Sequence, residues 1–308
     1  MSRPKKEHME DKTSVVDSDT LKLRLHEATN APPAFVLLMG PAQQMGKQWA
    51  ISKEESTIGR TLEADIFVDD RSVSRRHAKL IFREGEVFIK DINSANGTEV
   101  EGQRIEPEVL VVLKNNQQVK TGNVIFKYLA EGNLEIVSNR DRYDKSRLDP
   151  LTQIFNKGAL LSTGEEVFKR AKTMGVALTV VVFDLDNFKF LNDTWGHQAG
   201  DIVLKEMSAL IKRKVIRGED FFARFGGEEF CLVLLGSDQR QGVEIGERIR
   251  STVEKFDFEY RGEKMPVTIS VGVASLDPSM TSWSQLFDKS DQASYLSKKN
   301  GKNRVSTL

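Results

Sequence analysis

Two short stretches in the second half of the chain decide its fold: VVVFDLD at residues 180–186 and FGGEEF at residues 225–230. The first is a run of β-branched and aromatic residues, which predicts a buried strand, and it ends in two carboxylates. The Gly-Gly pair of the second predicts a tight hairpin turn that carries two adjacent carboxylates. We therefore expect the strand end and the turn to bring acidic side chains together.

These acids predict a metal site. Asp184, Glu228 and Glu229 offer oxygen ligands with no His or Cys beside them. A set of oxygen ligands suits a hard cation such as Mg²⁺, with Mn²⁺ as the alternative, and Mg²⁺ usually accompanies nucleotide phosphates. Adjacent carboxylates on a hairpin repel each other without a counter-ion, which favours metal binding over a purely structural role.

Composition limits the class of protein. The chain has 308 residues and a formal net charge of zero, which is enough for two modest domains and argues against a general nucleic-acid binder. Its single cysteine, Cys231, lies in an apolar run and is expected in a core. The apolar run at residues 34–39 is too short to span a membrane or form a signal core, so we expect a cytoplasmic protein without a membrane segment.

The pattern along the chain divides it into four segments. Residues 1–31 are mostly charged or hydroxylated and predict a disordered arm containing Ser and Thr. Residues 32–131 contain short β-rich runs separated by Gly, Asn and Asp, which predicts an all-β sandwich. Residues 132–148 predict a linker helix that ends before Pro150, and residues 149–308 predict an α+β domain with a mainly antiparallel sheet.

Helical and strand periodicities place the elements of this α+β domain, and Asp201 is predicted as the N-cap of one helix. We expect helices at residues 157–172, 201–214, 241–255 and 282–299, strands at 177–184 and 267–274, and a hairpin at 221–235.

Three motifs fall on predicted loops of the β-rich segment: IGR at residues 58–60, SVSRRHA at 72–78 and DINSANGT at 91–98. Each motif alone is common, but the three in this order on one β-domain are specific. Together they resemble a forkhead-associated (FHA) domain, a module that binds phosphothreonine, across most of residues 35–128.

The FHA resemblance implies that Arg60, Ser74 and Arg75 contact the phosphate and that Asn96 contacts the peptide main chain. A dianionic phosphate needs a guanidinium fork with hydroxyl and backbone donors, which these residue types supply. An ordinary loop salt bridge or turn hydroxyl is the alternative for Arg60 and Ser74. His77 has no metal-ligand partners near it in the sequence, so we expect it to brace the loops.

The carboxylate stretches resemble the signature of GGDEF-type diguanylate cyclases in its Gly-Gly-Glu-Glu-Phe form, and the resemblance covers roughly residues 149–305. The resemblance implies a palm-like sheet of the kind shared by nucleotide cyclases and polymerases. It also implies a reaction in which two GTP molecules form cyclic di-GMP and release two pyrophosphates. Because each half-site holds one GTP, it implies a homodimer.

The same resemblance implies roles for the acids. Asp184, Glu228, Glu229 and the backbone carbonyl of Leu185 would bind the metal, and Glu229 would also assist removal of the proton from the attacking hydroxyl. Asp186 either joins this set or structures the loop.

The segment at residues 187–201 matches the family's phosphate and base segment. Asn192 offers a donor and an acceptor, and Asp201 would accept from guanine N1 and N2, which excludes adenine. Lys302 stands where the family more often has arginine, so the charge is kept and the fork is lost. The substrate-binding set implied by the resemblance is Phe188, Lys189, Asn192, His197, Asp201, Lys298 and Lys302, and Lys189 is also counted as catalytic.

Some of these residues have plainer alternatives. Phe188 is of a type that more often packs in a core, Lys298 could be a solvated helix end, and Asp201 could be only a helix cap. In the loop at residues 149–157, Gln153 stands where the family usually has glycine. That departure concerns how activation is transmitted, and it leaves the active-site ligands untouched.

Arg217 and Asp220 precede Gly226 at the spacing of the family's RxxD inhibitory site, at which cyclic di-GMP binds. An arginine can pair with phosphate or stack on guanine, and an aspartate can accept from its Watson–Crick edge. Arg248 is a candidate secondary contact. A surface salt bridge is the alternative for the pair.

Three function classes follow. The first is an active diguanylate cyclase, regulated by phosphothreonine recognition and by product feedback. The second is a catalytically weak domain that senses GTP or cyclic di-GMP, and the third is a phosphothreonine-dependent scaffold. The phosphothreonine peptide would come from another protein or from the chain's own arm, with Thr13 and Thr20 as the best-placed sites.

Overall fold

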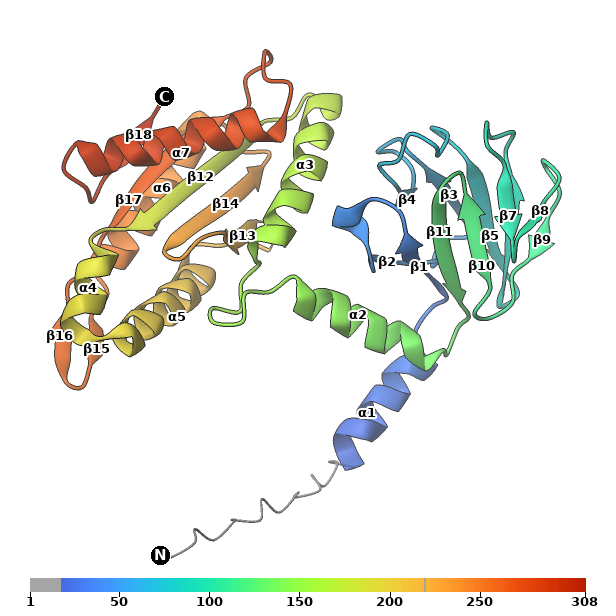
Figure 1. The fold of residues 1–308 in the computed structure, drawn as a ribbon, viewed down its shortest axis with the longest axis horizontal. Helices are drawn as coiled ribbons and strands as arrows, with labels where there is room; N and C mark the ends of the chain where they lie inside the picture. Colours follow the sequence, from blue (N-terminus) through green and yellow to red (C-terminus); the bar gives the residue numbers. More distant parts are fainter. Residues whose placement is uncertain (1–17, 219) are drawn as a thin grey trace, which may run out of the picture. The chain divides into compact units, whose positions relative to one another are not determined.

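The computed structural model of the protein describes residues 18–218 and 220–308. These residues form two compact units, whose boundary falls within helix α2 between Arg142 and Tyr143. The first unit is a β-sandwich and the second is an α+β domain (Figure 1). This architecture confirms the predicted fold class, and the predicted limits of the four segments stay predictions.

Two sheets make the sandwich of the first unit, with strand orders β2-β1-β11-β10-β7-β8 and β4-β3-β5-β6-β9. Along β6, buried positions alternate with more exposed ones, which is the period-two pattern of a strand with one face in a core. Phe35, Phe126, Leu80 and Ile89 fill the space between the sheets. The elements are β1 Ala34–Met39, β2 Gln48–Ala50, β3 Glu55–Gly59, β4 Ile66–Phe67, β5 Ala78–Arg83, β6 Glu86–Asp91, β7 Thr98–Val100, β8 Gln103–Arg104, β9 Val111–Val112, β10 Gln118–Thr121 and β11 Val124–Leu129. The short helix η1 Ala42–Gln44 follows β1 in the chain and is grouped with the second unit.

The disorder predicted for residues 1–31 is wrong for part of that segment, because Ser18–Thr29 forms helix α1. Its last turn buries Ala28, and Asn30 Nδ2 donates to the carbonyl of His26, which closes the helix end. The polar composition concealed this short anchored helix. Thr13, one of the two predicted phosphorylation sites, lies outside the described residues.

A second helix, α2 Leu134–Ser146, lies within the predicted linker. Asn133 begins it by accepting a hydrogen bond from the backbone N–H of Glu135 at 2.8 Å, and Ile136 and Val137 are buried. Ile136 packs in an apolar cluster with Leu129 at the end of β11. The first turns of α2 are therefore packed on the sandwich.

The second unit has one central sheet of strand order β13-β14-β12-β17-β18, antiparallel except for the β17–β18 pair. Every residue of β12 is buried, as its apolar run predicts. The elements are α3 Lys157–Met174, β12 Leu178–Leu185, α4 Phe188–Trp195, α5 His197–Lys214, β13 Phe221–Arg224, β14 Glu229–Leu235, α6 Gln239–Glu254, β15 Phe258–Tyr260, β16 Glu263–Met265, β17 Ile269–Ser275, α7 Trp283–Lys299 and β18 Val305–Thr307.

Helices cover both faces of this sheet, because successive side chains of β12 point to opposite sides. Val180 and Val182 pack with residues of α3 and α7, whereas Val181 and Phe183 pack with residues of α4, α5 and α6. Cys231 is fully buried in the first of these clusters, as predicted, and burial raises the pKa of its thiol.

The sequence analysis places one helix start wrongly. Helix α5 begins at His197 rather than at Asp201, and Gly196 is its N-cap. Asp201 therefore lies inside the helix and is not a cap. The additional helix α4 precedes α5, and left-handed Asn187, with φ of 56°, allows it to begin directly after the strand.

Across the described ranges 18–218 and 220–308, we find no helix whose length and apolar content would let it cross a bilayer.

Candidate functional sites

The register of the central sheet brings the predicted metal ligands to one place. Asp184 on β12 lies opposite Glu229 on β14, and the backbone N–H of Leu185 donates to the carbonyl of Glu228 at 3.3 Å. A Cβ at Gly226 would collide with the Glu229 carboxylate, so glycine at that position leaves the carboxylate room in its present place. The four predicted ligand positions therefore meet at the end of β12.

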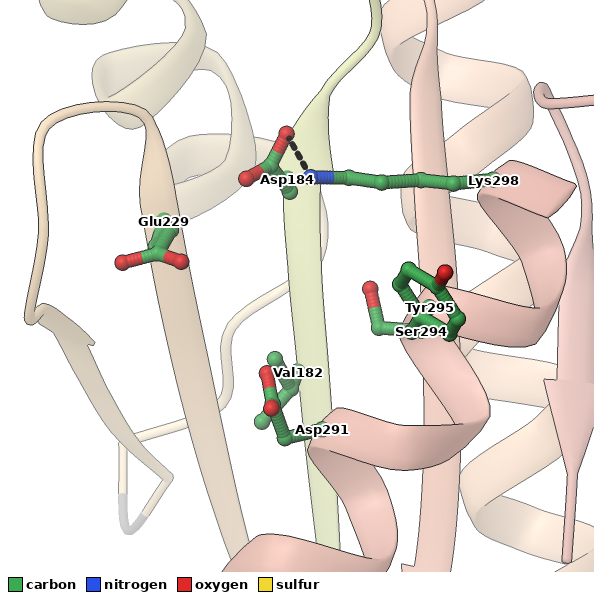
Figure 2. A pocket seen from close by; sticks show the side chains of 7 residues that line it. All are labelled: Val182, Asp184, Glu229, Asp291, Ser294, Tyr295 and Lys298. Carbon is green, nitrogen blue, oxygen red and sulfur yellow. Dashed lines mark ion pairs between the residues drawn. The ribbon is translucent and has the colours of Figure 1, made fainter.

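A lysine neutralises part of this acidic group. Lys298 at the end of α7 places its Nζ 2.8 Å from Oδ1 of Asp184, a side chain that is only 8% exposed (Figure 2). Burial raises the pKa of Asp184 to about 6, the charges of Glu228 and Glu229 add to this rise, and Lys298 opposes it. The strand end is thus an electrostatically strained group of carboxylates with one ammonium as its counter-charge.

The donor chemistry fits a divalent cation. All of the predicted ligands are oxygens, and the Lys298 ammonium already stands in for a cation at Asp184. Within the described part of the chain, however, no three acidic, His or Cys side chains are gathered closely enough to hold an ion in this conformation. The metal-binding set therefore stays a prediction.

A pocket of about 160 Å³ opens beside Asp184 and Lys298. Three of its residues, Asp291, Ser294 and Tyr295, were missed by the sequence analysis, although they precede Lys298 by seven, four and three positions and so share its helix face. Burial raises the pKa of Asp291, and the charge of Lys298 opposes that rise. The pocket is lined by Val182, Asp184, Glu229, Asp291, Ser294, Tyr295 and Lys298 (Figure 2).

Arg224 supports the Gly-Gly turn and was also missed. Its Nε and Nη2 donate to the carbonyl of Gly227 at 3.0 and 2.7 Å, and its Nη1 pairs with Asp149 Oδ1 at 3.0 Å. Burial would raise the pKa of Asp149, but hydrogen bonds from Thr152 and the pairing with Arg224 outweigh it and lower that pKa. An aspartate just after the linker helix is thus connected to the turn that carries Glu228 and Glu229.

The loop that departs from the family pattern keeps an unusual backbone conformation. Gln153 has φ of 57°, in the left-handed region that glycine adopts most easily. Its side-chain Nε2 donates to the carbonyl of Pro150 at 2.9 Å, which holds the turn. The substitution of glycine by Gln153 is therefore accommodated locally.

Asp186 structures its loop, which was one of its two predicted roles. Its carboxylate accepts from Thr268 Oγ1 at 2.7 Å and from Ser270 Oγ at 2.6 Å, and it also accepts from the backbone N–H of Asn303 at 3.0 Å. Lys302 hydrogen-bonds through Nζ to Oδ1 of Asn187 in the same region.

The remaining predicted substrate residues lie on α4 and α5. Phe188 is buried in the hydrophobic core, as its packing alternative predicts. Asn192 is half-buried, and its Oδ1 occupies the space that a side chain at Gly200 would need. Lys189, His197 and Asp201 are exposed. Their roles with substrate stay predictions.

The proposed inhibitory residues lie beyond the end of α5. The backbone N–H of Arg217 donates to Asp220 Oδ2 at 2.8 Å, which forms a turn and leaves the Arg217 side chain exposed. On α6, Arg248 Nη2 donates to the carbonyl of Val215 at 3.0 Å. The structure thus brings Arg248 next to the segment that leads into Arg217.

In the first unit, His77 braces the loops, as predicted. The backbone N–H of Ser74 donates to its Nδ1 at 3.0 Å, so Nε2 carries the proton and donates to the carbonyl of Gly97 at 3.0 Å. The ring is fully buried, and burial lowers the pKa of His77, although Gly97 and the charge of Asp91 oppose this. His77 is therefore a neutral link between two of the three motifs.

Further hydrogen bonds join these loops. The Ser74 hydroxyl accepts from the backbone N–H of Ala95 at 3.0 Å, and Asn96 Nδ2 donates to the carbonyl of Ser72 at 2.7 Å. The backbone N–H of Arg60 donates to the carbonyl of Ser74 at 3.1 Å. The four residues predicted to bind phosphopeptide thus lie on three connected loops, with Arg60 and Arg75 exposed.

The sequence analysis assigned no role to Asp91. Its buried carboxylate accepts from the Ser94 N–H and hydroxyl at 2.8 and 2.6 Å and from the Thr98 hydroxyl at 2.7 Å. An aspartate followed three residues later by serine is a turn signal that could have revealed this anchor.

Comparisons with known proteins identify the two domains that carry these residues. The family model for the diguanylate cyclase GGDEF domain matches residues 146–304, and that for the FHA domain matches residues 56–122. Diguanylate cyclase A of Treponema denticola is 44% identical over 128 residues, which are 42% of this chain and 34% of that protein. The diguanylate cyclase DgcP of Pseudomonas aeruginosa is 36% identical over 165 residues, 54% of this chain and 24% of that protein. The chain thus spans about a quarter to a third of the length of these relatives.

Solved structures show the same fold in the second unit. The GGDEF domain of DgcB from Caulobacter crescentus, in complex with c-di-GMP, is 32% identical with a TM-score of 0.51 and covers 53% of this chain and 93% of that one. The diguanylate cyclase SiaD of Pseudomonas aeruginosa, in complex with its activator SiaC, is 31% identical with a TM-score of 0.53 and covers 57% and 66%. The chain therefore belongs to the diguanylate cyclase GGDEF-domain family and carries an FHA domain ahead of its GGDEF domain.

Proposed function

We propose that this protein is a diguanylate cyclase that condenses two GTP molecules into cyclic di-GMP and releases two pyrophosphates. The observation that carries the proposal is the pairing of Asp184 with Glu229 across β12 and β14, with Lys298 within 2.8 Å of the Asp184 carboxylate. A domain that only bound nucleotide would not need a buried carboxylate of raised pKa at this position.

Each residue of the site has a task in this reaction. Asp184, Glu228, Glu229 and the Leu185 carbonyl would hold Mg²⁺ or Mn²⁺, which would neutralise phosphate charge. Glu229, at the start of β14, accepts the proton of the attacking 3′-hydroxyl. Lys298 exchanges its contact with Asp184 for one with phosphate.

Residues of α4 and α5, together with Lys302, select and hold the nucleotide. Lys189 and Lys302 bring positive charge to the phosphates, while Asn192 and Asp201 hydrogen-bond the guanine edge and His197 completes this wall. Phe188 packs in the core and holds α4 in place behind it. Because each chain offers one set of these groups and the reaction joins two GTP molecules, catalysis takes place in a homodimer.

Product feedback is a second part of the proposal. Cyclic di-GMP binds at Arg217 and Asp220, with Arg248 as a further contact. The exposed Arg217 side chain and its neighbour Arg248 supply two guanidinium groups for phosphates or guanine faces.

The FHA domain contributes phosphothreonine recognition through Arg60, Ser74, Arg75 and Asn96. Its ligand is either a phosphorylated site of the chain's own N-terminal arm, with Thr13 or Thr20 modified, or a segment of another protein. A tethered arm would bind effectively even at a weak site, because tethering raises its local concentration. Titrating phosphorylated and unphosphorylated peptides of residues 8–25 into protein lacking the arm separates these two sources.

A second candidate function is a sensor of GTP or cyclic di-GMP with weak catalysis, and the ion pair that covers Asp184 favours it. The cytoplasm, where GTP is available, is the proposed location for either function.

The decisive experiment is incubation of the purified full chain with GTP and Mg²⁺, followed by identification of the nucleotide products. We expect cyclic di-GMP and pyrophosphate in a ratio of one to two. Tight GTP or cyclic di-GMP binding without product would favour the sensor, and neither binding nor product would favour the phosphothreonine-dependent scaffold.

A further inference from the structure

The turn between α7 and β18 has an unusual backbone. Three consecutive residues, Gly301, Lys302 and Asn303, have positive φ values of 112°, 63° and 43°. Residues with a side chain avoid this region, so two of them in succession persist only where the surroundings hold them there. Lys302 is one of the proposed phosphate-binding residues, which makes the support of this turn relevant to function.

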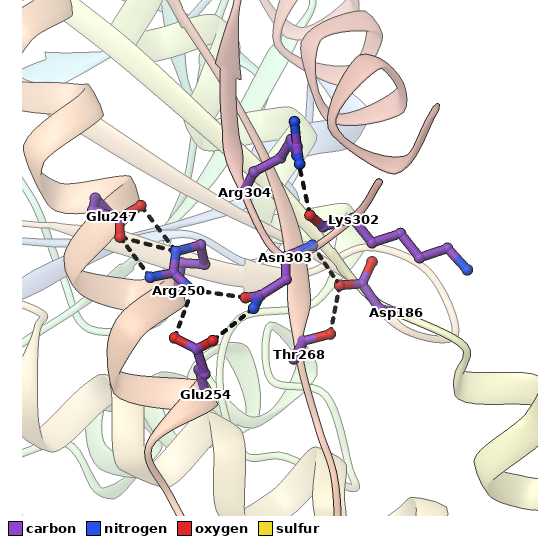
Figure 3. A network of polar contacts seen from close by, with 8 residues as sticks. All are labelled: Asp186, Glu247, Arg250, Glu254, Thr268, Lys302, Asn303 and Arg304. Carbon is purple, nitrogen blue, oxygen red and sulfur yellow. Dashed lines mark hydrogen bonds and ion pairs between the residues drawn. The ribbon is translucent and has the colours of Figure 1, made fainter. Parts of the chain in front are cut away.

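Three groups hold Asn303 in this conformation (Figure 3). Its backbone N–H donates to Asp186 Oδ2 at 3.0 Å. Its side-chain Oδ1 accepts from Arg250 Nη1 at 2.7 Å, and its Nδ2 donates to Glu254 Oε1 at 2.7 Å. Both ends of the amide and the main chain are therefore engaged, so Asn303 has one orientation available.

Hydrogen bonds to two glutamates also fix the position of Arg250. Its Nε and Nη2 donate to Glu247 at distances of 2.6 to 2.9 Å, and its Nη1 donates to Glu254 at 2.8 Å. Its side chain is only 14% exposed, so solvent competes little for these hydrogen bonds. A planar guanidinium flanked by two carboxylates makes a rigid support, which a lysine could not reproduce.

The network also extends, through Asp186, to the end of β12. Asp186 is fixed by Thr268 and Ser270 and directly follows Leu185, whose carbonyl belongs to the proposed metal set. Lys302 hydrogen-bonds to Asn187, the next residue of the same loop. The turn of residues 301–303 and the end of β12 are thus joined at two points.

We propose that Arg250 and Asn303 are positioning residues, which hold the backbone of Lys302 so that its ammonium reaches the GTP phosphates. This inference rests on the proposed function, because it takes Lys302 to be a phosphate ligand. A lysine has a flexible stem and no fork, so its placement depends on its main chain more than that of an arginine would. Asn303 directly follows Lys302, and Arg250 holds Asn303, so both act through Lys302.

A double-mutant cycle on the full chain tests this role. Affinity is measured by calorimetry with 3′-deoxy-GTP, which lacks the attacking hydroxyl and therefore binds without reacting. We expect Lys302→Ala and Asn303→Ala each to weaken binding about tenfold, as does loss of one charged phosphate contact. Because both remove the same contact, the double variant should also lose about tenfold rather than about a hundredfold.

Companion variants separate positioning from general stability. Asn303→Gly keeps the left-handed backbone accessible but removes both side-chain anchors, and it should match Asn303→Ala in affinity. Arg250→Lys keeps the charge but loses the forked guanidinium, and like the Asn303 variants it should weaken nucleotide binding. Arg240→Ala is the matched control, because Arg240 is an exposed arginine of the same helix that pairs only with Glu244 at 3.9 Å among the contacts of described residues. Its affinity should not change.

The outcomes discriminate clearly. Additive losses in the double variant, or an unchanged affinity in Asn303→Gly, would overturn the positioning role. With GTP as substrate, the KM should rise while kcat changes by less than about twofold, since a phosphate contact made before and during reaction is uniform binding. A wild-type chain that binds 3′-deoxy-GTP but forms no cyclic di-GMP refutes the proposed activity while the affinity cycle still decides the positioning role. A wild-type chain that does not bind the nucleotide refutes both.

Discussion

The two sites of this protein are fixed by different physical means. The loops of the FHA domain are joined by buried groups with satisfied hydrogen bonds, above all the neutral ring of His77 and the carboxylate of Asp91. The acids of the proposed catalytic site instead lie where the register of β12 and β14 places them, and the buried charge of Asp184 is balanced by the flexible side chain of Lys298.

This difference predicts how each site responds to its ligand. A receptor whose loops are already braced loses little freedom on binding, so its affinity depends on the exposed arginines that meet the phosphate. A buried carboxylate with a raised pKa destabilises the folded protein, and the folded protein becomes more stable when a more strongly bound cation replaces the lysine. We therefore expect the FHA site to be rigid without ligand and the catalytic site to be stabilised by ion and nucleotide.

The largest effect is expected when single charges are removed from the proposed catalytic site. Asp184→Asn and Glu229→Gln should each lower the rate of cyclic di-GMP synthesis by about a hundredfold or more, because both remove charge that would bind the metal. Synthesis is measured as product formed from GTP and Mg²⁺, and circular dichroism checks the fold.

The Asp184 variant also tests the electrostatic contrast. Without divalent ions, Asp184→Asn should unfold at a higher temperature than the wild type, because a buried charge is gone. Added Mg²⁺ should raise the unfolding temperature of the wild type but not that of Asp184→Asn. Asp257→Asn, at an exposed carboxylate, is the control. Near-normal synthesis by either active-site variant would refute the proposed catalytic assignment.

The next largest effect concerns the phosphopeptide site of the FHA domain. Arg60→Ala should weaken binding of a phosphothreonine peptide by about thirtyfold, since it removes a charge-assisted hydrogen bond to the phosphate while His77 and Asp91 keep the loops in place. Fluorescence titration with a labelled peptide gives the affinity. Arg83→Ala, at an exposed arginine of β5 that stacks on Phe88, should bind normally. Equal losses in both variants would show a nonspecific charge effect.

The comparison also shows what the sequence could predict. The apolar run of β12 and the Gly-Gly turn predicted a buried strand that ends in acids and the hairpin of β13 and β14 that the turn closes. This hairpin follows from alternation and turn chemistry, which are local properties. The pairing of β12 with β14, which places Asp184 opposite Glu229, joins strands that no turn connects, and only their shared acidic ends indicated it.

Contacts between distant segments were not predictable in the same way. Arg224 pairs with Asp149 across 75 positions, and Asn303 meets Asp186 across 117. Neither pair leaves a periodic pattern in the sequence, because each is set by how helices and strands pack. The start of α5 was misplaced for a local reason, since Gly196, with φ of 86°, allows the helix to begin earlier than the acidic cap signal suggests.

A smaller effect is expected at the proposed product site, which involves neither the hydrogen-bonded loops of the FHA domain nor the acids at the end of β12. Replacing Arg217 and Asp220 together by Ala should relieve feedback and raise the accumulated cyclic di-GMP several-fold, with the initial rate unchanged. Calorimetry with cyclic di-GMP should show weaker binding. Arg213→Ala, at an exposed basic residue near the end of α5, is the control. Unchanged product affinity in the double variant would mean that the Arg217–Asp220 turn is only structural.

The smallest effect concerns the neutral His77 ring, which links the loops of the FHA domain. Because burial lowers the pKa of His77 below its usual value of 6.5, the unfolded chain binds this proton more readily than the folded domain does. The contribution of His77 to stability is therefore complete above pH 6.5 and is lost as the pH falls from there toward the folded-state pKa, by at most about 1.4 kcal/mol per pH unit. Hydrogen exchange of the β5 amides at pH 7.5 and 5.5 reports this local stability. His77→Gln cannot titrate, so it should be less stable at pH 7.5 but lose less on acidification than the wild type. An equal acid loss in both proteins would mean that other groups carry it and that the brace is not the pH-sensitive part of the FHA domain.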